Sequence, residues 1–264
     1  MRKLGRRGQA LAFGAIALGL AVATSIVGGR ALDPYGWIPL AAAVLVILPG
    51  GGLWLRATWS GFGIGTAGFR AWLPAIAIPA AVLTAGYVAA ALTGNVQLSL
   101  GGTNPAVFAG ATVVIIAVGS VEAIGEELGW RGYLLPRLAD LGRVRVGLIS
   151  GLLWAAWHAP LIYIAAAYHQ GAGPLYMLPF TITIVAMSVI ANELRMSSGS
   201  SWPAVIFHGA HNAIWYQLGA LTVGSTGLLA GIGEESGIVP MTLYVAVAVW
   251  IVLRRRAWGP AIKC

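Results

Sequence analysis

Three short clusters of polar residues interrupt an apolar chain of 264 residues, of which only 9% are charged. In the first cluster, Gly125-Glu126-Glu127-Leu128-Gly129-Trp130-Arg131, the spacing lets Glu127 and Arg131 pair on one face of a helix. Glu126 points about 100° away from Glu127 and cannot share that partner as easily. A glutamate without a counter-ion in a water-poor site can act as a general base near neutral pH. The alternative interpretation is a helix end whose charged side chains reach the surface.

The other two clusters contain histidines inside apolar stretches. His158 follows Trp154 by four residues, so the indole ring can pack under the imidazole, although a buried histidine with aromatic packing is equally typical of this pattern. Asn212 follows His208 by four residues on one helix face, and His211 lies off that line. A His and an Asn at this spacing can present two hydrogen-bond donors to one oxygen, as in an oxyanion hole.

Together, the three clusters can form a hydrolytic site. Glu126 and His158 would hold and deprotonate a water molecule that attacks a peptide carbonyl. His208 and Asn212 would stabilise the resulting oxyanion. His158, or Glu126 once protonated, would give a proton to the leaving amine. We therefore expect Glu126, His158 and His208 to converge on one cavity, and we expect that cavity to open towards the cytoplasm.

Apolar helices must position these residues, because 58% of the chain is hydrophobic and its charged fraction is far below the roughly 25% of a soluble domain. This composition excludes soluble globular and disordered proteins. It predicts an all-α, polytopic integral membrane protein with about eight transmembrane helices. The apolar stretches are 9–28, 36–55, 72–93, 105–128, 145–167, 174–194, 202–220 and 237–253. We expect a single membrane domain over 1–264, with the catalytic core at about 105–220.

The basic residues predict the orientation of these helices. With the N-terminus in the cytoplasm, 15 of the 16 Lys and Arg residues fall on the cytoplasmic side, and only Arg30 falls outside. This bias explains the net charge of +8 without nucleic-acid binding. We expect a multi-pass protein of the plasma (cell inner) membrane with both termini cytoplasmic. His169, Glu234 and Glu235 fall in outer loops, where we expect them to be solvated.

The three clusters, in this order, resemble the motif set of the CAAX prenyl endopeptidase type II family, also called the CPBP or Abi family. The second motif of that family usually has Phe where this chain has Trp154. The resemblance implies an intramembrane endopeptidase of the glutamic type. The catalytic residues that it implies are Glu126, His158, His208 and Asn212. The supporting residues are Glu127, Arg131 and Trp154.

The resemblance also implies a membrane-associated peptide or protein as substrate, within the lipid bilayer. Eukaryotic relatives remove the last three residues of prenylated CAAX proteins. The excess of Arg over Lys and the abundance of Ala and Gly suggest a GC-rich bacterial genome. Bacterial members of that family resemble three classes of protein: enzymes that process peptide pheromones or bacteriocins, immunity factors, and regulators of membrane sensors. We therefore expect a membrane sensor or a peptide-export system as partner, and no nucleic acid.

Three other functions remain alternatives. Glu126, His158 and His208 are possible zinc ligands, but Asn212 is a poor one and the chain has no His-Glu-x-x-His motif, so we expect no metal or other cofactor. A non-catalytic immunity or regulatory scaffold would keep the same motifs for packing. A transporter is disfavoured because the apolar stretches show no repeat symmetry. The lone Cys264 excludes a disulfide framework, a cysteine zinc site and a cysteine nucleophile within the fold.

Overall fold

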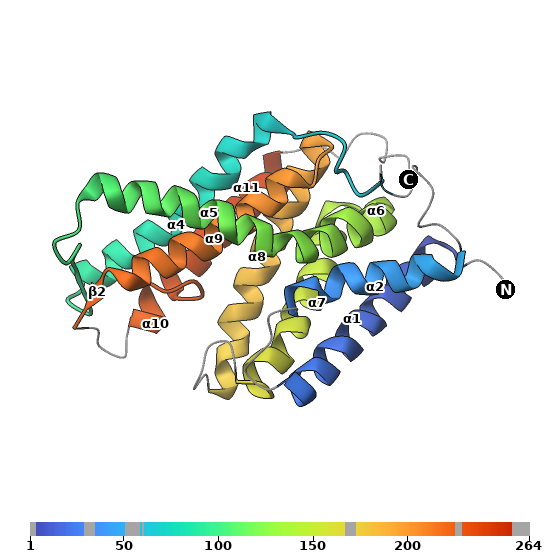
Figure 1. The fold of residues 1–264 in the computed structure, drawn as a ribbon, viewed down its shortest axis with the longest axis horizontal. Coiled ribbons are helices and arrows are strands. Elements are labelled where there is room, and N and C mark those ends of the chain that lie inside the picture. Colours follow the sequence, from blue (N-terminus) through green and yellow to red (C-terminus); the bar gives the residue numbers. More distant parts are fainter. Residues whose placement is uncertain are drawn as a thin grey trace.

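A computed structural model describes residues 4–28, 35–50, 59, 61–166, 173–224 and 229–254. These residues form a helical bundle with one short antiparallel ladder, β1 (Gln97–Leu98) with β2 (Thr222–Val223), so the all-α prediction is confirmed (Figure 1). The long helices are α1 (Arg6–Gly28), α2 (Ile38–Ile47), α4 (Trp72–Leu92), α5 (Pro105–Glu127), α7 (Arg143–Tyr163), α8 (Met177–Ser198), α9 (Trp202–Ala220) and α11 (Ile238–Arg254). Shorter elements are the 3-10 turns η1 (Tyr35–Trp37), η2 (Leu48–Gly50), η4 (Phe69–Ala71), η6 (Ala139–Leu141) and η7 (Pro174–Tyr176), the π-helix η5 (Leu128–Leu134), and the helices α6 (Leu135–Leu138) and α10 (Leu229–Ile232).

Each predicted apolar stretch overlaps one of the long helices, but the number eight is not confirmed for membrane crossings. Five described helical stretches are long and apolar enough to cross a membrane, namely Arg6–Gly28, Phe69–Leu92, Pro105–Leu141, Arg143–Tyr163 and Met177–Ser198. The helices α2, with 10 residues, and α11, with 17, fall short of the roughly 20 residues that a span needs. Helix α9 has 19 residues but carries His208, His211, Asn212 and Gln217, which reduce its hydropathy.

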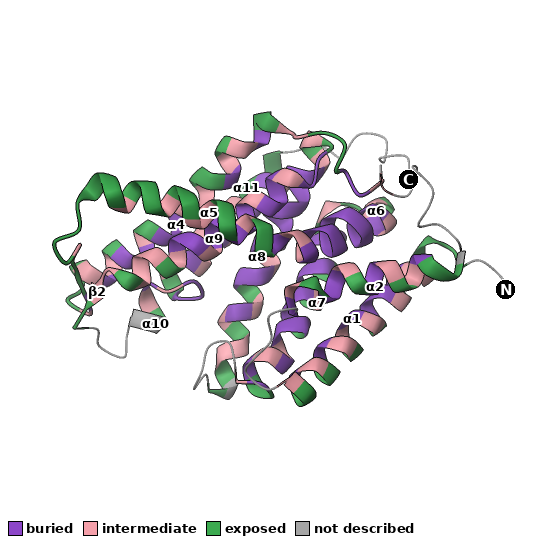
Figure 2. Cartoon of the chain, in the orientation of Figure 1, coloured by how far each residue is buried: buried purple, intermediate pink, exposed green. Residues whose placement is uncertain are grey.

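Helix α5 continues beyond the predicted end of the fourth stretch. It begins at an Asn104 cap, whose side chain accepts a hydrogen bond from the backbone nitrogen of Ala106 at 2.8 Å. It then runs through η5 and α6, so that one helical stretch extends from Pro105 to Leu141. All seven residues of η5 are buried, whereas much of α5 is exposed (Figure 2). Single π-helical turns are rare and concentrate at functional sites, and this one directly follows Glu127.

The core surrounds η5, where the two halves of the bundle meet. On one side, α9 packs against α5 and α4, and on the other α1 packs against α2 and α7 (Figure 1). Helix α8 packs against α7, α9 and α11. Phe13 of α1 contacts Trp130 and Tyr133 of η5, with ring centroids 5.3 and 5.4 Å away. The residues that follow Glu127 therefore anchor its helix in the packed interior.

Two glycines bring the segment between α1 and α2 against the end of α5. A Cβ atom on Gly125 would lie 2.6 Å from the carbonyl oxygen of Gly36, and one on Gly129 would lie 2.4 Å from Pro39 Cβ. Both distances are too short for a larger side chain, so glycine is needed for this packing. The close approach places Tyr35 and Gly36 beside Glu126, which lies on the same part of α5.

Candidate active site

The structure brings the four predicted catalytic residues together around one cavity of about 150 Å³. Glu126 comes from α5, His158 from α7, and His208 and Asn212 from α9. A cavity of this size has room for a few water molecules, since each takes about 30 Å³ in the liquid. The other described residues that line it are Tyr35, Gly36, Trp154, Trp157, Leu161, Ile184, Met187, His211 and Glu235.

Trp154 connects most of the polar groups of the site. Its indole Nε1 donates a hydrogen bond to Glu126 Oε2 at 2.8 Å. The guanidinium of Arg131 lies over its ring, 4.3 Å from the centroid, and its ring meets His208 edge to face at 5.2 Å. Its ring centroid is 6.0 Å from that of His158, with the planes tilted, so Trp154 is not stacked under that imidazole as the spacing suggested. The indole instead positions Glu126 and covers Arg131.

The adjacent carboxylates have different partners. Glu127 is fully buried, and its Oε1 accepts hydrogen bonds from Arg131 Nη1 at 2.9 Å and from His208 Nδ1 at 3.0 Å. The spacing predicted the Arg131 contact, but it gave no indication of the His208 contact. Glu126 accepts its hydrogen bond from Trp154 and lines the cavity. One glutamate is therefore placed for chemistry at the cavity, and the other holds a cation and a histidine in place.

The hydrogen bonds of His158 and His208 indicate which ring nitrogen serves chemistry. His158 Nδ1 lies 2.9 Å from the carbonyl oxygen of Trp154, and His208 Nδ1 bonds to Glu127. A carbonyl or an ionised carboxylate only accepts, so Nδ1 carries a proton in both rings. Nε2 is then the nitrogen that exchanges a proton or donates to substrate. The Trp157 ring, at 4.8 Å, packs edge to face against His158 and fixes its orientation.

A second polar cluster on the wall of the cavity was not predicted. His211 Nδ1 lies 2.8 Å from Tyr244 Oη, and His211 Nε2 lies 3.1 Å from Glu235 Oε2. Glu235 is only 3% exposed, so the expectation that it is solvated is wrong. The segment before α11 folds back onto α9 and buries this carboxylate against His211. The sequence signal for this cluster was that His211 had no assigned partner. His169, which was also expected to be solvated, lies outside the described residues.

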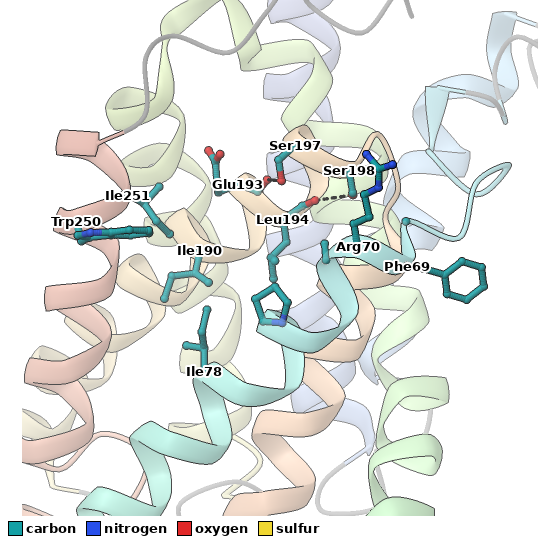
Figure 3. A pocket seen from close by; sticks show the side chains of 13 residues that line it. Phe69, Arg70, Ile78, Ile190, Glu193, Leu194, Ser197, Ser198, Trp250 and Ile251 are labelled. Carbon is teal, nitrogen blue, oxygen red and sulfur yellow. Dashed lines mark hydrogen bonds between the residues drawn. The ribbon is translucent and has the colours of Figure 1, made fainter.

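A larger cavity, of about 650 Å³, lies between α4, α8 and α11. Figure 3 shows Ile78 and Ile190 along its lower wall, and Glu193, Ser197 and Arg70 near its upper rim. Among the described residues, none of the predicted site residues lines it. The acids and bases that hydrolysis requires gather around the smaller cavity, so chemistry and not volume identifies the candidate active site.

The zinc alternative requires several ligand side chains around one ion. The described residues contain no group of three or more His, Cys, Asp or Glu side chains placed to hold one metal ion. In the suggested ligand set, Glu126 is bonded to Trp154, and His208 is bonded to Glu127. Histidines that bind zinc through Nε2 are oriented by the same kind of hydrogen bond at Nδ1, so removal of metal with a chelator is the test of this alternative.

Residues 106–214 match the family model described as type II CAAX prenyl endopeptidase Rce1-like. The Rce1-like segment contains every motif residue from Glu126 to Asn212, so the resemblance read from the motifs is confirmed. No curated protein sequence matches the chain significantly. The Rce1-like match indicates CAAX-type protease activity in a membrane, while Tyr35, Glu235 and Tyr244 lie outside the matched residues.

Proposed function

We propose that this chain is an intramembrane endopeptidase that hydrolyses peptide bonds with a glutamate-activated water. One observation carries the proposal, which is that Glu126, His158, His208 and Asn212 of the Rce1-like segment line a single small cavity. Glu126 and His158 reach this cavity from different helices and offer a carboxylate and an imidazole to the same few water molecules. This pairing supplies the general base and the general acid that peptide hydrolysis requires.

In the first step, a water molecule held by Glu126 and His158 attacks the carbonyl carbon of the scissile peptide bond. Its proton passes to the Glu126 carboxylate, and the carbonyl electrons move onto oxygen to give a tetrahedral oxyanion. The Trp154 hydrogen bond holds Glu126 Oε2, which leaves Oε1 as the oxygen that faces the water. Positioned proton transfer of this kind contributes about 10²–10⁴-fold to a rate.

In the second step, His208 and Asn212 stabilise the oxyanion. The Asn212 side-chain amide donates one hydrogen bond, and His208 donates another through Nε2–H in its imidazolium form. The buried Glu127 carboxylate, bonded to His208 Nδ1, supports that positive charge. The tetrahedral intermediate then collapses, the C–N bond breaks, and a proton from Glu126 or His158 passes to the leaving amine. The products are one new carboxylate and one new amine.

The proposal includes no metal cofactor. The substrate is a membrane-associated peptide or protein, because the cavity lies among helices that are apolar enough to cross a membrane. A membrane sensor or a peptide-export system is the partner that we propose, in the plasma membrane of a bacterium. Activity should survive treatment with a zinc chelator. Loss of activity that zinc restores would favour the ligand set Glu126, His158 and His208 instead.

Comparative membrane proteomics of cells that express wild type or Glu126→Gln tests the proposed chemistry. Glu126→Gln keeps the shape of the side chain and removes the base, so cleavage should fall by at least about 10²-fold. Glu122→Gln is the matched control, because Glu122 lies one turn earlier on α5 and is exposed. We expect a peptide that is cut in wild type and in Glu122→Gln but not in Glu126→Gln. Identical peptide sets in all three strains would support a non-catalytic scaffold.

A further inference from the structure

The larger cavity, between α4, α8 and α11, has a polar end and an apolar end. Along η4 and α4, Arg70 lies at the polar end and Ile78 at the apolar end, eight positions or about 12 Å apart. Along α8, Ser198 lies at the polar end and Ile190 at the apolar end, with the same separation. A Cβ atom on Gly68 would lie 3.2 Å from Ser198 Cβ, so the start of α4 meets the end of α8. Both helices therefore give the cavity the same direction of polarity, with Ile78 below and Arg70 above in Figure 3.

The polar end carries a net positive charge. Among the described residues that line the cavity, the one acid is Glu193, and its Oε2 accepts a hydrogen bond from Arg143 Nε at 3.0 Å, which compensates its charge. Arg70 is exposed and lines the same end. Arg254 follows Trp250 by one turn of α11, and its guanidinium lies 5.9 Å from the centroid of the Trp250 ring, which lines the cavity. Arg70 and Arg254 therefore add two positive charges to a neutral pair.

The surfaces beside the larger cavity are apolar. Leu73 and Ile76 on α4, and Val249 and Leu253 on α11, are all exposed. Helices α4 and α8 belong to stretches that are long and apolar enough to cross a membrane, and α11 packs against both. Trp250 is half exposed near the end of α11, and tryptophan at a helix end is typical of the membrane interface. The cavity therefore has lipid as its neighbour, with headgroups at the polar end and acyl chains at the apolar end.

We propose that the larger cavity binds one anionic phospholipid of the surrounding leaflet. The headgroup lies at the polar end, where Arg70 and Arg254 supply the positive charge that a phosphate attracts. An acyl chain runs past Ile190 towards Ile78. The volume of about 650 Å³ is within the roughly 300–1,000 Å³ of typical ligand pockets. Basic pockets between transmembrane helices are sites where anionic headgroups bind.

The two ends of the cavity together select this class of ligand. A soluble anion has no group to place against Ile78 and Ile190, and a neutral lipid gains little from the arginines. A phospholipid with net negative charge matches both ends, and its long axis matches the direction in which the cavity changes from polar to apolar. This site is separate from the catalytic cavity and does not depend on the proposed hydrolysis.

Native mass spectrometry of the purified full chain in detergent tests this site without any activity assay. The probes are phosphatidylglycerol and phosphatidylcholine with identical acyl chains, and inorganic phosphate alone. Arg70→Gln and Arg254→Gln each remove one cation. Arg6→Gln is their matched control, because Arg6 is exposed at the start of α1 and does not line the cavity. Ile78→Trp fills the apolar end, and Ile76→Trp is its matched control, because Ile76 does not line the cavity although it lies two positions earlier on α4.

We expect the wild type to bind phosphatidylglycerol more tightly than phosphatidylcholine. Each arginine substitution should weaken phosphatidylglycerol binding about fivefold. Phosphatidylcholine binding should change much less, because the choline cation offsets its phosphate. Ile78→Trp should weaken the binding of both lipids, and both control variants should bind them as the wild type does. If Ile78→Trp does not accumulate, the two arginine variants still test the site, since they replace exposed side chains.

Four results would overturn the proposal. Equal affinity of the wild type for the two lipids would show that the arginines do not select a headgroup. Unchanged lipid binding by Ile78→Trp would place the lipid elsewhere on the molecule. Inorganic phosphate that binds as tightly as phosphatidylglycerol would reduce the site to one for soluble anions. A lipid-free dimer that Ile78→Trp dissociates would show that a second copy of the chain occupies the cavity.

Discussion

The hydrogen bond from Trp154 Nε1 to Glu126 Oε2 is the contact that most directly sets the geometry of the candidate base. The family usually has Phe at this position, and Phe has no donor to offer. In this chain the indole therefore adds a hydrogen bond to a charged group, an interaction worth about 1.5–3 kcal/mol. We regard Trp154 as a positioning residue that acts through Glu126.

Trp154→Phe keeps an aromatic ring under Arg131 and removes the hydrogen bond to Glu126. Cleavage should fall about tenfold, mainly in kcat, because Glu126 loses its fixed orientation. Trp130→Phe is the matched control, since Trp130 Nε1 is buried without a hydrogen-bond partner among the described residues and Trp130 does not line the cavity. The control variant removes the same indole atoms but no hydrogen bond, so it should lower kcat less than Trp154→Phe does. Equal losses in the two variants would show that Trp154 acts only by packing.

Glu127 combines a structural and a functional contact in one oxygen atom. Glu127→Gln leaves Arg131 buried without its counter-ion, which should lower stability by about 3–5 kcal/mol. It also removes the charge that supports His208, so cleavage should fall as well. The double variant Glu127→Gln/Arg131→Gln should recover part of the melting temperature but little of the activity. A single variant that is folded and fully active would refute both roles.

At the scale of the elements, α5 and α9 bring two parts of the site together through a backbone contact. A Cβ atom on Gly209 would lie 2.3 Å from the backbone nitrogen of Ser120 and 2.5 Å from its Cα. The neighbouring backbone cannot move away as a flexible side chain could. Gly209 directly follows His208, so the distance between these helices also sets the position of His208 relative to Glu127.

Gly209→Ala should force α5 and α9 apart and lower the melting temperature by several degrees, with loss of cleavage. Gly219→Ala is the matched control on the same helix, because a Cβ there would lie 3.5 Å from Tyr87 Oη, an ordinary contact. Removing glycine from a helix reduces the entropy of the unfolded chain, so Gly219→Ala should leave stability unchanged or raise it by about 0.4–1 kcal/mol. A tolerated Gly209→Ala would mean that the two helices do not need this approach.

The helices themselves followed from the sequence because apolar runs and their interruptions are local properties. The four residues around the cavity also followed, because polar side chains in apolar stretches usually face a bundle interior or a cavity, and because their order resembles the family's motif set. The continuation of α5 through η5 did not follow, because burial by α1 and α2 is what keeps that segment helical. Glu126 was therefore placed at a helix end, although Arg137 lies eleven positions, or about 16 Å, further along the same helical stretch. Contacts between distant segments, such as His211 with Glu235, leave no periodic pattern to read.

At the scale of the whole molecule, the number of helices that cross the membrane decides on which side the C-terminus lies. Five described helical stretches are long and apolar enough, whereas the eight-span topology with a cytoplasmic C-terminus requires α2, α9 and α11 to cross as well. From the segment before α5 to the C-terminus, the eight-span topology has five crossings, by α5, α7, α8, α9 and α11. An odd number of crossings places these two points on opposite sides of the membrane. If either α9 or α11 did not cross, the number of crossings would be even, and the segment before α5 and the C-terminus would lie on the same side.

Two reporter fusions resolve this count. A reporter that is active only in the cytoplasm should work when fused after Cys264 and should fail when inserted after Gly101. Gly101 is exposed and adopts a positive φ of 57°, and a Cβ atom there would have no neighbour within 4 Å, so the insertion falls in an exposed turn with free space around it. A reporter that requires the periplasm should give the reverse result. The same reporter working at both positions would mean that α9 or α11 does not cross. If α9 is that helix, His208 and Asn212 lie on a segment that enters the membrane without crossing it, and its polar side chains face the protein interior and not the lipid.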